Sequence, residues 1–299
     1  MKILLFGKNG QVGWELQRSL APLGEITALD RDDVAPYSGD LLDPQVIADT
    51  IRRARPDVIV NAAAHTAVDK AESEPELARA LNATAPGVMA REARACGAWL
   101  VHYSTDYIFD GSGSAPHAED DPKGPLNVYG QTKLEGEELV RAAGGRHLIF
   151  RTSWVYASRG RNFARTILHR ASERDDLAVI DDQHGAPTGA DLLADVTAHA
   201  IRAVRGRSDL YGTYHLVASG ETTWFGYACH LIAAARAAGQ PMRVEQHAIR
   251  PVPTSAFVTP ARRPLNSRLA TLKVQQAFGL VLPDWKVGVD RMLSEVLGR

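Results

Sequence analysis

Short apolar runs alternate with longer amphipathic stretches through the first half of the chain. The apolar runs have the length and composition of strands and cover residues 2–7, 25–30, 57–63 and 99–104. The amphipathic stretches predict helices at about 11–20, 76–95 and 129–141. Strands separated by helices pair in parallel through right-handed crossovers, and strands that are apolar throughout are covered on both faces. The pattern predicts an α/β fold with a doubly wound parallel sheet.

The second half keeps the short apolar runs but contains more turns. Its strands are predicted at 147–156, 177–181, 213–219 and 242–247. The Pro-rich stretch at 250–264 excludes a regular helix or a central strand, because proline lacks the backbone donor that both need. No linker separates the halves, so we expect two lobes that share a cleft. The first domain is predicted over 1–155 and a smaller C-terminal lobe over 156–299, with some segments returning to the first domain.

Composition and charge narrow the class of partner. The 34 Lys and Arg residues nearly cancel the 35 Asp and Glu residues in a chain of 299, leaving a net charge of -1. This balance favours a small molecule over nucleic acid or an anionic membrane. No apolar run is long enough for a signal peptide or a membrane span, which predicts a soluble, cytoplasmic protein. Cys96 and Cys229 lack metal-ligand spacing and are expected to be buried free thiols in helices.

Three glycines mark the junction between the first predicted strand and the first predicted helix. Gly7, Gly10 and Gly13 are spaced three apart in "GKNGQVG". In this context glycines permit a tight turn and let the backbone approach a pyrophosphate at the helix N-terminus. The alternative is that the glycines only form a turn. We interpret the segment as a dinucleotide-binding site because strand, helix and a following acidic residue all agree.

That acidic residue is Asp30, at the end of the second predicted strand. A carboxylate there accepts hydrogen bonds from adenosine ribose hydroxyls and favours NADH, whereas the neighbouring Arg31 can pair with the 2′-phosphate of NADPH. Asp30 favours NADH and Arg31 favours NADPH, so the sequence leaves the choice between the cofactors open. The alternative for both is a solvated ion pair.

Two further loops follow predicted strands and are assigned to the cofactor. Small residues at 62–64 let a flat ring system pass close over the edge of the sheet. The residues that we assign from these loops are Asp40, Leu41, Ala64, His65 and Thr66. A single histidine in a loop is more often structural than catalytic, so His65 is kept only as a member of the cofactor loop.

The predicted helix at 129–141 begins with a tyrosine and a lysine four residues apart. Tyr129 and Lys133 therefore share one helix face, and the ammonium is expected to lower the phenol pKa, so that the phenol serves as a general acid. Such a pair also occurs by chance, with the ring packed and the lysine solvated. Ser104 and Thr105, at the end of the preceding strand, add hydroxyls that can bind a carbonyl oxygen, and Asp106 follows them either as a substrate contact or as a turn former.

These motifs resemble the extended short-chain dehydrogenase/reductase family. "GKNGQVG", "STDYIF" and "YGQTK" follow one another in the order and at the separations typical of it. Longer strings, among them "NAAAHTAVDKAESEPE", "DDQHGAPTGADLLAD" and "TPARRPLNSRL", resemble the members that reduce a dTDP-linked 4-keto-6-deoxy sugar, and the match runs essentially end to end. The resemblance implies a Rossmann-type domain followed by a sugar-nucleotide-binding lobe.

The resemblance also implies a reaction and a set of contacts. The reaction is hydride transfer from NADPH or NADH to the C4 ketone of dTDP-6-deoxy-L-lyxo-4-hexulose. Tyr129 is the proton donor, Lys133 tunes its pKa and anchors the nicotinamide ribose, and Thr105 polarises the ketone. The implied cofactor contacts are Gly10, Gln11, Val12, Asp30, Asp40, Leu41, Ala64, His65, Thr66 and Tyr103. The implied substrate contacts are Thr105, Asp106 and Trp154.

Three further residues are candidates for the substrate. Arg262 and Arg263 are offered as a pair for the diphosphate, because a guanidinium fork matches phosphate oxygens, against the alternative of a basic surface loop. Asn162 is a weaker candidate, since asparagine often caps the N-terminus of a helix and a helix is predicted to follow it.

Some members of the family are described as magnesium-dependent homodimers. Asp191 stands where a glutamate ligand is expected, which argues against metal-linked dimerisation. Glu15 is a second acidic residue considered for the metal, and its alternative interpretation is a solvated helix residue. The sequence therefore leaves Mg²⁺ and the homodimer open. Two rival functions are also kept: a sugar-nucleotide epimerase or dehydratase on the same scaffold, and a non-catalytic NADP-binding regulatory subunit.

Overall fold

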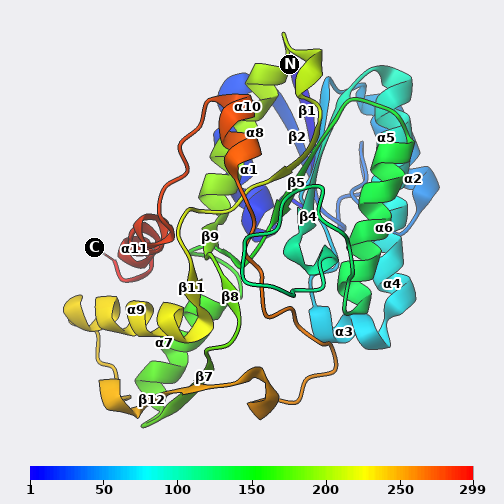
Figure 1. Cartoon of the computed structure of the whole chain (residues 1–299). Coiled ribbons are helices and arrows are strands. Elements are labelled where there is room, and N and C mark those ends of the chain that lie inside the picture. The colour runs from blue at the N-terminus through cyan, green and yellow to red at the C-terminus, as the bar shows by residue number, and fades with distance from the viewer. Residues whose placement is uncertain (299) are drawn as a thin grey trace.

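The computed structural model describes residues 1–298 and is built around one parallel sheet (Figure 1). Its strand order is β10-β5-β4-β3-β1-β2, and every neighbouring pair is parallel. The strands are β1 (Lys2–Phe6), β2 (Glu25–Leu29), β3 (Val58–Asn61), β4 (Trp99–Thr105), β5 (His147–Thr152) and β10 (Gly212–His215). Because β10 comes from the second half of the chain, the chain returns to this sheet after leaving it.

Helices cover both faces of the sheet, as the continuous apolar strands predicted. One face packs on α1 (Gln11–Leu20), α8 (Ala190–Val204) and α10 (Leu272–Phe278). The other face packs on α2 (Pro44–Ala54), α5 (Ala85–Cys96) and α6 (Val128–Ala142). The two helix layers lie on opposite sides of the strands in Figure 1. The prediction of a doubly wound α/β fold is confirmed.

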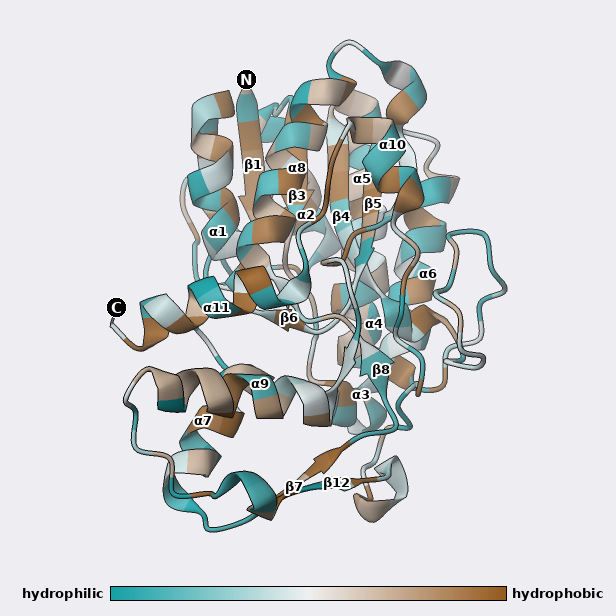
Figure 2. Cartoon of the chain, turned by 60° about the vertical axis from the view of Figure 1, so that its left-hand side comes forward, coloured by the Kyte–Doolittle hydropathy of each residue, from teal (hydrophilic) through white to brown (hydrophobic). Residues whose placement is uncertain are grey.

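A second apolar core lies beside the carboxyl ends of the strands. It is formed mainly by α7 (Phe163–Glu173), α9 (Trp224–Ala237) and α11 (Trp285–Val296), with the parallel pair β7 (Leu177–Ile180) and β12 (Ile249–Val252) at its edge (Figure 2). The remaining strands are two-residue pairs: β6 (Val155–Tyr156) with β9 (Thr188–Gly189), and β8 (His184–Gly185) with β11 (Thr222–Thr223). The short helices are α3 (Val68–Ser73) and α4 (Pro75–Arg79).

The predicted elements agree with the structure where the pattern is local. The helix at 11–20 is confirmed without change, while the stretch at 76–95 contains α4, a π-helical turn at Ala80–Thr84 and α5. The strand predicted at 242–247 is wrong, because the strand in this region, β12, begins at Ile249. Pro251 is tolerated there because β12 pairs on one side only, with β7.

The predictions for the two cysteines are confirmed only in part. Cys96 ends α5 and Cys229 lies in α9, and both thiols are free. The prediction of burial is wrong for Cys96, which is exposed at the C-terminal end of α5, and Cys229 is half-buried. Among residues 1–298, no helix combines the length and apolarity needed to cross a membrane.

Candidate active site

A cavity of about 550 Å³ opens at the carboxyl ends of β1, β3, β4 and β5. In a parallel sheet these ends, together with the N-termini of the following helices, form the usual ligand-binding crevice. The predicted residues that line the cavity are Gly7, Gly10, Gln11, Val12, Asp30, Ala64, Thr66, Tyr103, Ser104, Thr105, Asp106, Tyr129, Lys133 and Trp154. The predicted residues outside its lining are Gly13, Arg31, Asp40, Leu41, His65, Asn162, Arg262 and Arg263.

The glycine turn packs so closely against neighbouring backbone that it cannot accommodate side chains at Gly7 and Gly13. Gly7 has φ of +86°, and a Cβ there would lie 2.8 Å from the Ala63 nitrogen. A Cβ on Gly13 would lie 1.9 Å from the Gly7 carbonyl oxygen, so Gly13 shapes the turn although it lies outside the cavity. Gly10 caps α1 without a side-chain hydrogen bond, which leaves the first backbone N–H groups of the helix available. This backbone fits the pyrophosphate of a dinucleotide.

Asp30, and not Arg31, faces the cavity. The Asp30 carboxylate accepts the backbone N–H groups of Asn9 at 3.2 Å and of Arg31 at 2.7 Å. The Arg31 side chain is 77% exposed, and its nearest charged partner is Asp32, at 3.5 Å. The protein therefore presents an anion, fixed by backbone donors, at the position where the sequence predicts a ribose.

The other predicted loop residues make contacts within the protein itself. Asp40 accepts the backbone N–H of Leu42 at 3.0 Å, and Leu41 is buried in the core beneath α2. The His65 backbone N–H donates to the Asn82 side chain at 2.8 Å, and its ring lies 3.5 Å from the Glu74 carboxylate. These contacts hold the loops in place beside the cavity.

Tyr129 occupies the first turn of α6, and its hydroxyl meets Thr105. The helix begins there because the Asn127 side chain accepts the Gly130 backbone N–H at 2.8 Å. The Thr105 side chain lies close enough to the Tyr129 hydroxyl to lower its pKa, and it donates to Asp106 at 3.1 Å. Two hydroxyls, from β4 and from α6, thus converge on one point in the cavity.

The pKa of Tyr129 differs from the prediction. Burial raises the pKa of Tyr129 to about 12, against the opposing effect of the Thr105 hydrogen bond. The predicted lowering by Lys133 is absent because the lysine, which is 2% exposed, directs its ammonium to the Tyr103 carbonyl oxygen at 2.5 Å. Burial lowers the pKa of Lys133 to about 8, although the charge of Glu137 acts in the opposite direction. At neutral pH the protein therefore holds Tyr129 as a phenol and Lys133 as an ammonium.

Asp106 is a second buried group whose ionised form is disfavoured. Burial raises the pKa of Asp106 to about 7, and hydrogen bonds from Ser267 and Thr105 reduce that shift. Tyr107, which the sequence analysis did not single out, packs its ring edge-on against Tyr129, with the centroids 5.6 Å apart. The reactive end of the cavity is thus lined by hydroxyls and by a carboxyl group that titrates close to neutrality.

The far wall of the cavity is an aromatic stack. Trp154, at the break between β5 and β6, has φ of +49°, and its ring lies 3.6 Å from that of Trp224 at an angle of 14°. Trp224 begins α9, and its indole N–H donates to the Gln183 side chain at 3.0 Å. The stack forms a flat apolar wall of the kind that a deoxysugar or a base can contact.

Sequence reasoning missed six residues of the lining: Val68, Tyr107, Thr152, Ser153, Val155 and Trp224. Tyr107, Thr152, Ser153 and Val155 adjoin predicted residues, so a wider window around "STDYIF" and "FRTSWVY" was the signal that could have found them. Trp224 had no local signal, because it reaches the cavity from a distant helix. The hydroxyls of Thr152 and Ser153 are buried without a hydrogen-bond partner among the described residues.

The three remaining substrate candidates lie around the cavity. Asn162 caps α7 by accepting the Arg165 backbone N–H at 3.1 Å, and it donates to Gln11 at 2.9 Å. Arg263 makes a two-pronged ion pair with Asp69, at 2.9 and 2.7 Å. The Arg262 side chain is exposed. Neither arginine reaches the cavity lining.

The acidic residues considered for a metal pair with arginines. Glu15 lies 3.3 Å from Arg18, and Asp191 lies 3.6 Å from Arg291. Within the part of the chain that the structure describes, no group of three or more His, Cys, Asp or Glu side chains is arranged to hold a metal ion.

Comparisons with known proteins agree with this geometry. The family model described as RmlD substrate binding domain matches residues 1–297. The dTDP-4-dehydrorhamnose reductase of Escherichia coli K12 is 60% identical over 99% of this chain and 98% of its own length. The crystal structure of a dTDP-4-dehydrorhamnose reductase from Clostridium acetobutylicum superposes with a TM-score of 0.89 at 34% identity, covering 99% of each chain. That of the Bacillus anthracis dTDP-4-dehydrorhamnose reductase, in complex with NADP, superposes with a TM-score of 0.87 at 32% identity, covering 98% of this chain and 99% of the other. The chain therefore belongs to the RmlD substrate binding domain family, among the dTDP-4-dehydrorhamnose reductases.

Proposed function

We propose that the protein reduces the C4 ketone of dTDP-6-deoxy-L-lyxo-4-hexulose to give dTDP-L-rhamnose, using NADPH or NADH. The observation that carries the proposal is the convergence of the Tyr129 and Thr105 hydroxyls in the cavity that the glycine turn also lines. A ketone oxygen at that point meets a proton donor and a second hydrogen-bond donor. The 60% identity with the E. coli reductase supports the choice of substrate.

The residues divide the work as follows. Tyr129 donates a proton to the C4 oxygen, and its raised pKa keeps that proton in place until the oxygen becomes basic. Thr105, whose hydroxyl donates to Asp106 in the protein without substrate, would turn that hydrogen bond toward the same oxygen, and the stacked Trp154 and Trp224 form the wall against the sugar. Lys133, whose ammonium donates to the Tyr103 carbonyl oxygen, would hold the cofactor ribose and add a positive charge near the reacting groups. The nicotinamide, when bound, supplies the hydride.

The cofactor would lie along the edge formed by the glycine turn, Asp30, Ala64 and Thr66. The relative from B. anthracis binds NADP, while Asp30 faces this cavity and favours a free ribose. We therefore propose that the enzyme accepts both cofactors. Arg31 is free to swing toward a 2′-phosphate, because its ion pair with Asp32 is exposed and weak.

The substrate lobe is proposed to hold the nucleotide. We assign residues 1–155 mainly to the cofactor and 156–299 mainly to the sugar nucleotide, with β10 and its neighbours belonging to the first part. Asn162, Arg262 and Arg263 stay candidates for substrate contacts as the lobes approach each other. A cytoplasmic homodimer is the assembly that we propose.

The test measures the loss of reduced nicotinamide absorbance with dTDP-linked and UDP-linked 4-keto-6-deoxy sugars, each with NADPH and with NADH. We expect one equivalent of cofactor to be oxidised per equivalent of the dTDP sugar. An epimerase or dehydratase would convert the sugar without net oxidation, and a regulatory subunit would bind the cofactor without turnover. Either of these results would overturn the proposal.

A further inference from the structure

Behind the reactive residues, on the side of α6 that faces the sheet, lies a buried ion pair that the reaction does not use directly. Arg151 in β5 is 2% exposed, and Glu137 in α6 is fully buried. The guanidinium donates to both carboxylate oxygens of Glu137, each at 2.8 Å. Ion pairs buried to this degree are costly to desolvate and are weak evidence of a role in stability alone. The position of this pair therefore needs another reason.

The position of Glu137 relative to the site supplies that reason. Glu137 follows Lys133 by four residues, so the two side chains share one face of α6, one turn apart. Lys133 is 2% exposed, and among the residues that the structure describes its ammonium has hydrogen-bonding contacts with a carbonyl oxygen and a histidine nitrogen, at 2.5 and 3.5 Å. A buried ammonium with neutral contacts tends to lose its proton. A carboxylate one turn away opposes that loss.

Three neighbouring groups, His102, Tyr129 and Arg151, cannot stabilise the ammonium form of Lys133. His102, from β4, is 1% exposed, and burial together with the charge of Lys133 holds the pKa of His102 well below its usual range, so it is neutral. Tyr129, from the same helix, keeps its proton. Arg151, from β5, is a cation and acts in the wrong direction. Glu137 is left as the anion whose charge acts on the lysine.

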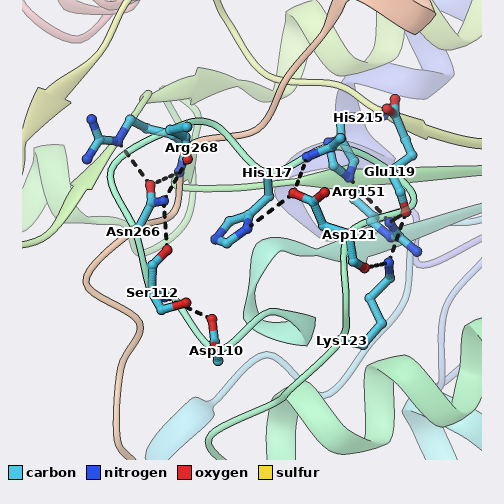
Figure 3. Close-up of polar contacts among 12 residues, drawn as sticks. Asp110, Ser112, His117, Glu119, Asp121, Lys123, Arg151, His215, Asn266 and Arg268 are labelled. Atoms are coloured by element: carbon cyan, nitrogen blue, oxygen red, sulfur yellow. Dashed lines mark hydrogen bonds and ion pairs between the residues drawn. The ribbon is translucent and has the colours of Figure 1, made fainter.

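Arg151 has the complementary task of keeping Glu137 ionised and in place. Burial alone would raise the pKa of Glu137, but the hydrogen bonds and charge of Arg151 bring it below its ordinary value. Arg151 is itself held, because its third nitrogen donates to the Glu119 carbonyl oxygen at 2.8 Å and lies 3.3 Å from His215 (Figure 3). Burial lowers the pKa of His215 to about 3, so this neighbour is neutral and does not compete for the carboxylate.

Arg141 also contacts the carboxylate but is placed differently. It donates to Glu137 at 2.9 Å from the outer end of α6 and is 39% exposed. Its charge is therefore screened by solvent, and its removal leaves both the Glu137 charge and the Arg151 contact in place. Arg141 thus offers a matched control within the same cluster.

We propose that Glu137, anchored by Arg151, is a positioning residue that keeps Lys133 in its ammonium form during catalysis. The inference rests on the proposed function, because it assigns Glu137 a part in the same reaction. It adds two supporting residues to that function. Arg151 holds Glu137 in place, and Glu137 keeps Lys133 charged, so that Lys133 can bind the cofactor and act on Tyr129.

The direct test is the titration of Lys133, followed by the Cε chemical shift in protein labelled with ¹³C at lysine Cε. The variant Lys133→Met identifies the signal. In Glu137→Gln we expect the titration midpoint to move down by about one pH unit, because a unit charge at helical i,i+4 distance is lost. In Arg141→Gln we expect no downward shift. An unchanged midpoint in Glu137→Gln overturns the proposal.

The pH profile of kcat/KM provides the second readout. The basic limb of the wild-type profile is expected near pH 8, and in Glu137→Gln it should move down together with the Lys133 titration. A purely structural role would instead lower kcat/KM in equal proportion at every pH, and that result would also overturn the proposal. If the wild type oxidises no cofactor, the proposed function fails, but the titration still decides the role of Glu137.

Loss of folding does not prevent the test. Glu137→Gln leaves a buried guanidinium with a neutral partner, which can unfold the protein. The double variant Glu137→Gln/Arg151→Met removes both charges and retains side-chain volume. The Lys133 midpoint in this variant should still be lower than in the wild type if Glu137 is the dominant partner, and a midpoint equal to or above that of the wild type would contradict the proposal.

Discussion

The two ends of the cavity are built by different means. At the cofactor end, the turn from Gly7 to Gly13 forms a site from backbone atoms of one continuous segment, and its shape depends on side chains being absent. At the sugar end, Thr105, Tyr129, Trp154 and Trp224 arrive from four separate segments, and the site depends on which side chains meet. The difference predicts that changes at the first end alter binding of both cofactors, whereas changes at the second alter turnover at constant cofactor affinity.

The largest effect is expected from Tyr129→Phe. The variant retains the ring, which packs against Tyr107, but removes the proton that the ketone oxygen receives. We expect kcat to fall by about 10³-fold or more, with the dissociation constant of NADPH nearly unchanged. Steady-state kinetics and cofactor fluorescence would measure the two quantities. A Phe variant with appreciable activity would remove Tyr129 from the role of proton donor.

Thr105→Val is expected to act in the same way but less strongly. Valine has nearly the same shape and lacks the hydroxyl that contacts Tyr129 and donates to Asp106. Loss of one hydrogen-bond donor to a developing negative charge lowers kcat by something like 10²-fold. If the loss appeared in cofactor affinity and not in kcat, the separation between the two ends would be wrong.

Gly13→Ala tests the cofactor end. The added Cβ would lie 1.9 Å from the Gly7 carbonyl oxygen, so the turn must open. We expect the affinities for NADPH and NADH to fall together by roughly 10- to 100-fold, the range typical of overpacking by one methyl group. Gly206→Ala is the matched control, because no atom of the part of the chain that the structure describes lies within 4 Å of a Cβ at that position. Selective loss of one cofactor would show that the turn does more than admit the pyrophosphate.

Asp106→Asn is expected to change stability in a pH-dependent way. The pKa of Asp106 is about 7 in the folded protein and near 3.8 in an unfolded chain, so between these values the unfolded chain binds fewer protons. Stability from this group therefore falls as pH rises from about 4 to about 7. The variant should be more stable than the wild type at pH 8 by up to about 4 kcal/mol, and nearly equal to it at pH 4.

Urea unfolding at pH 8 and pH 4 would measure this difference. Asp110→Asn is the contrasting variant, because hydrogen bonds from Ser112 lower the pKa of the exposed Asp110. Its carboxylate form is favoured by folding, so its removal should weaken stability at pH 8. Equal effects of the two variants would show that burial does not control Asp106.

The predictable parts of the molecule share one property: their information is local. The β1–turn–α1 unit was predicted with its helix at the correct residues, because glycine spacing, an apolar run and helical periodicity lie within twenty residues. The i,i+4 spacing of Tyr129 and Lys133 is likewise local, and α6 places both in the cavity lining. The strand predicted at 242–247 failed because β12 is defined by pairing with β7, about seventy residues earlier.

The sequence by itself determined the doubly wound α/β architecture, the glycine turn and the residue types that gather at the carboxyl edge of the sheet. Only the tertiary structure decided that Trp224 meets Trp154 and that Glu137 is held by Arg151 behind Lys133. It also decided that Tyr129 keeps its proton more strongly than the motif predicts. The physical reason is that periodicity and turn chemistry act between neighbours in the chain, whereas desolvation and charge pairing depend on segments brought together by the fold.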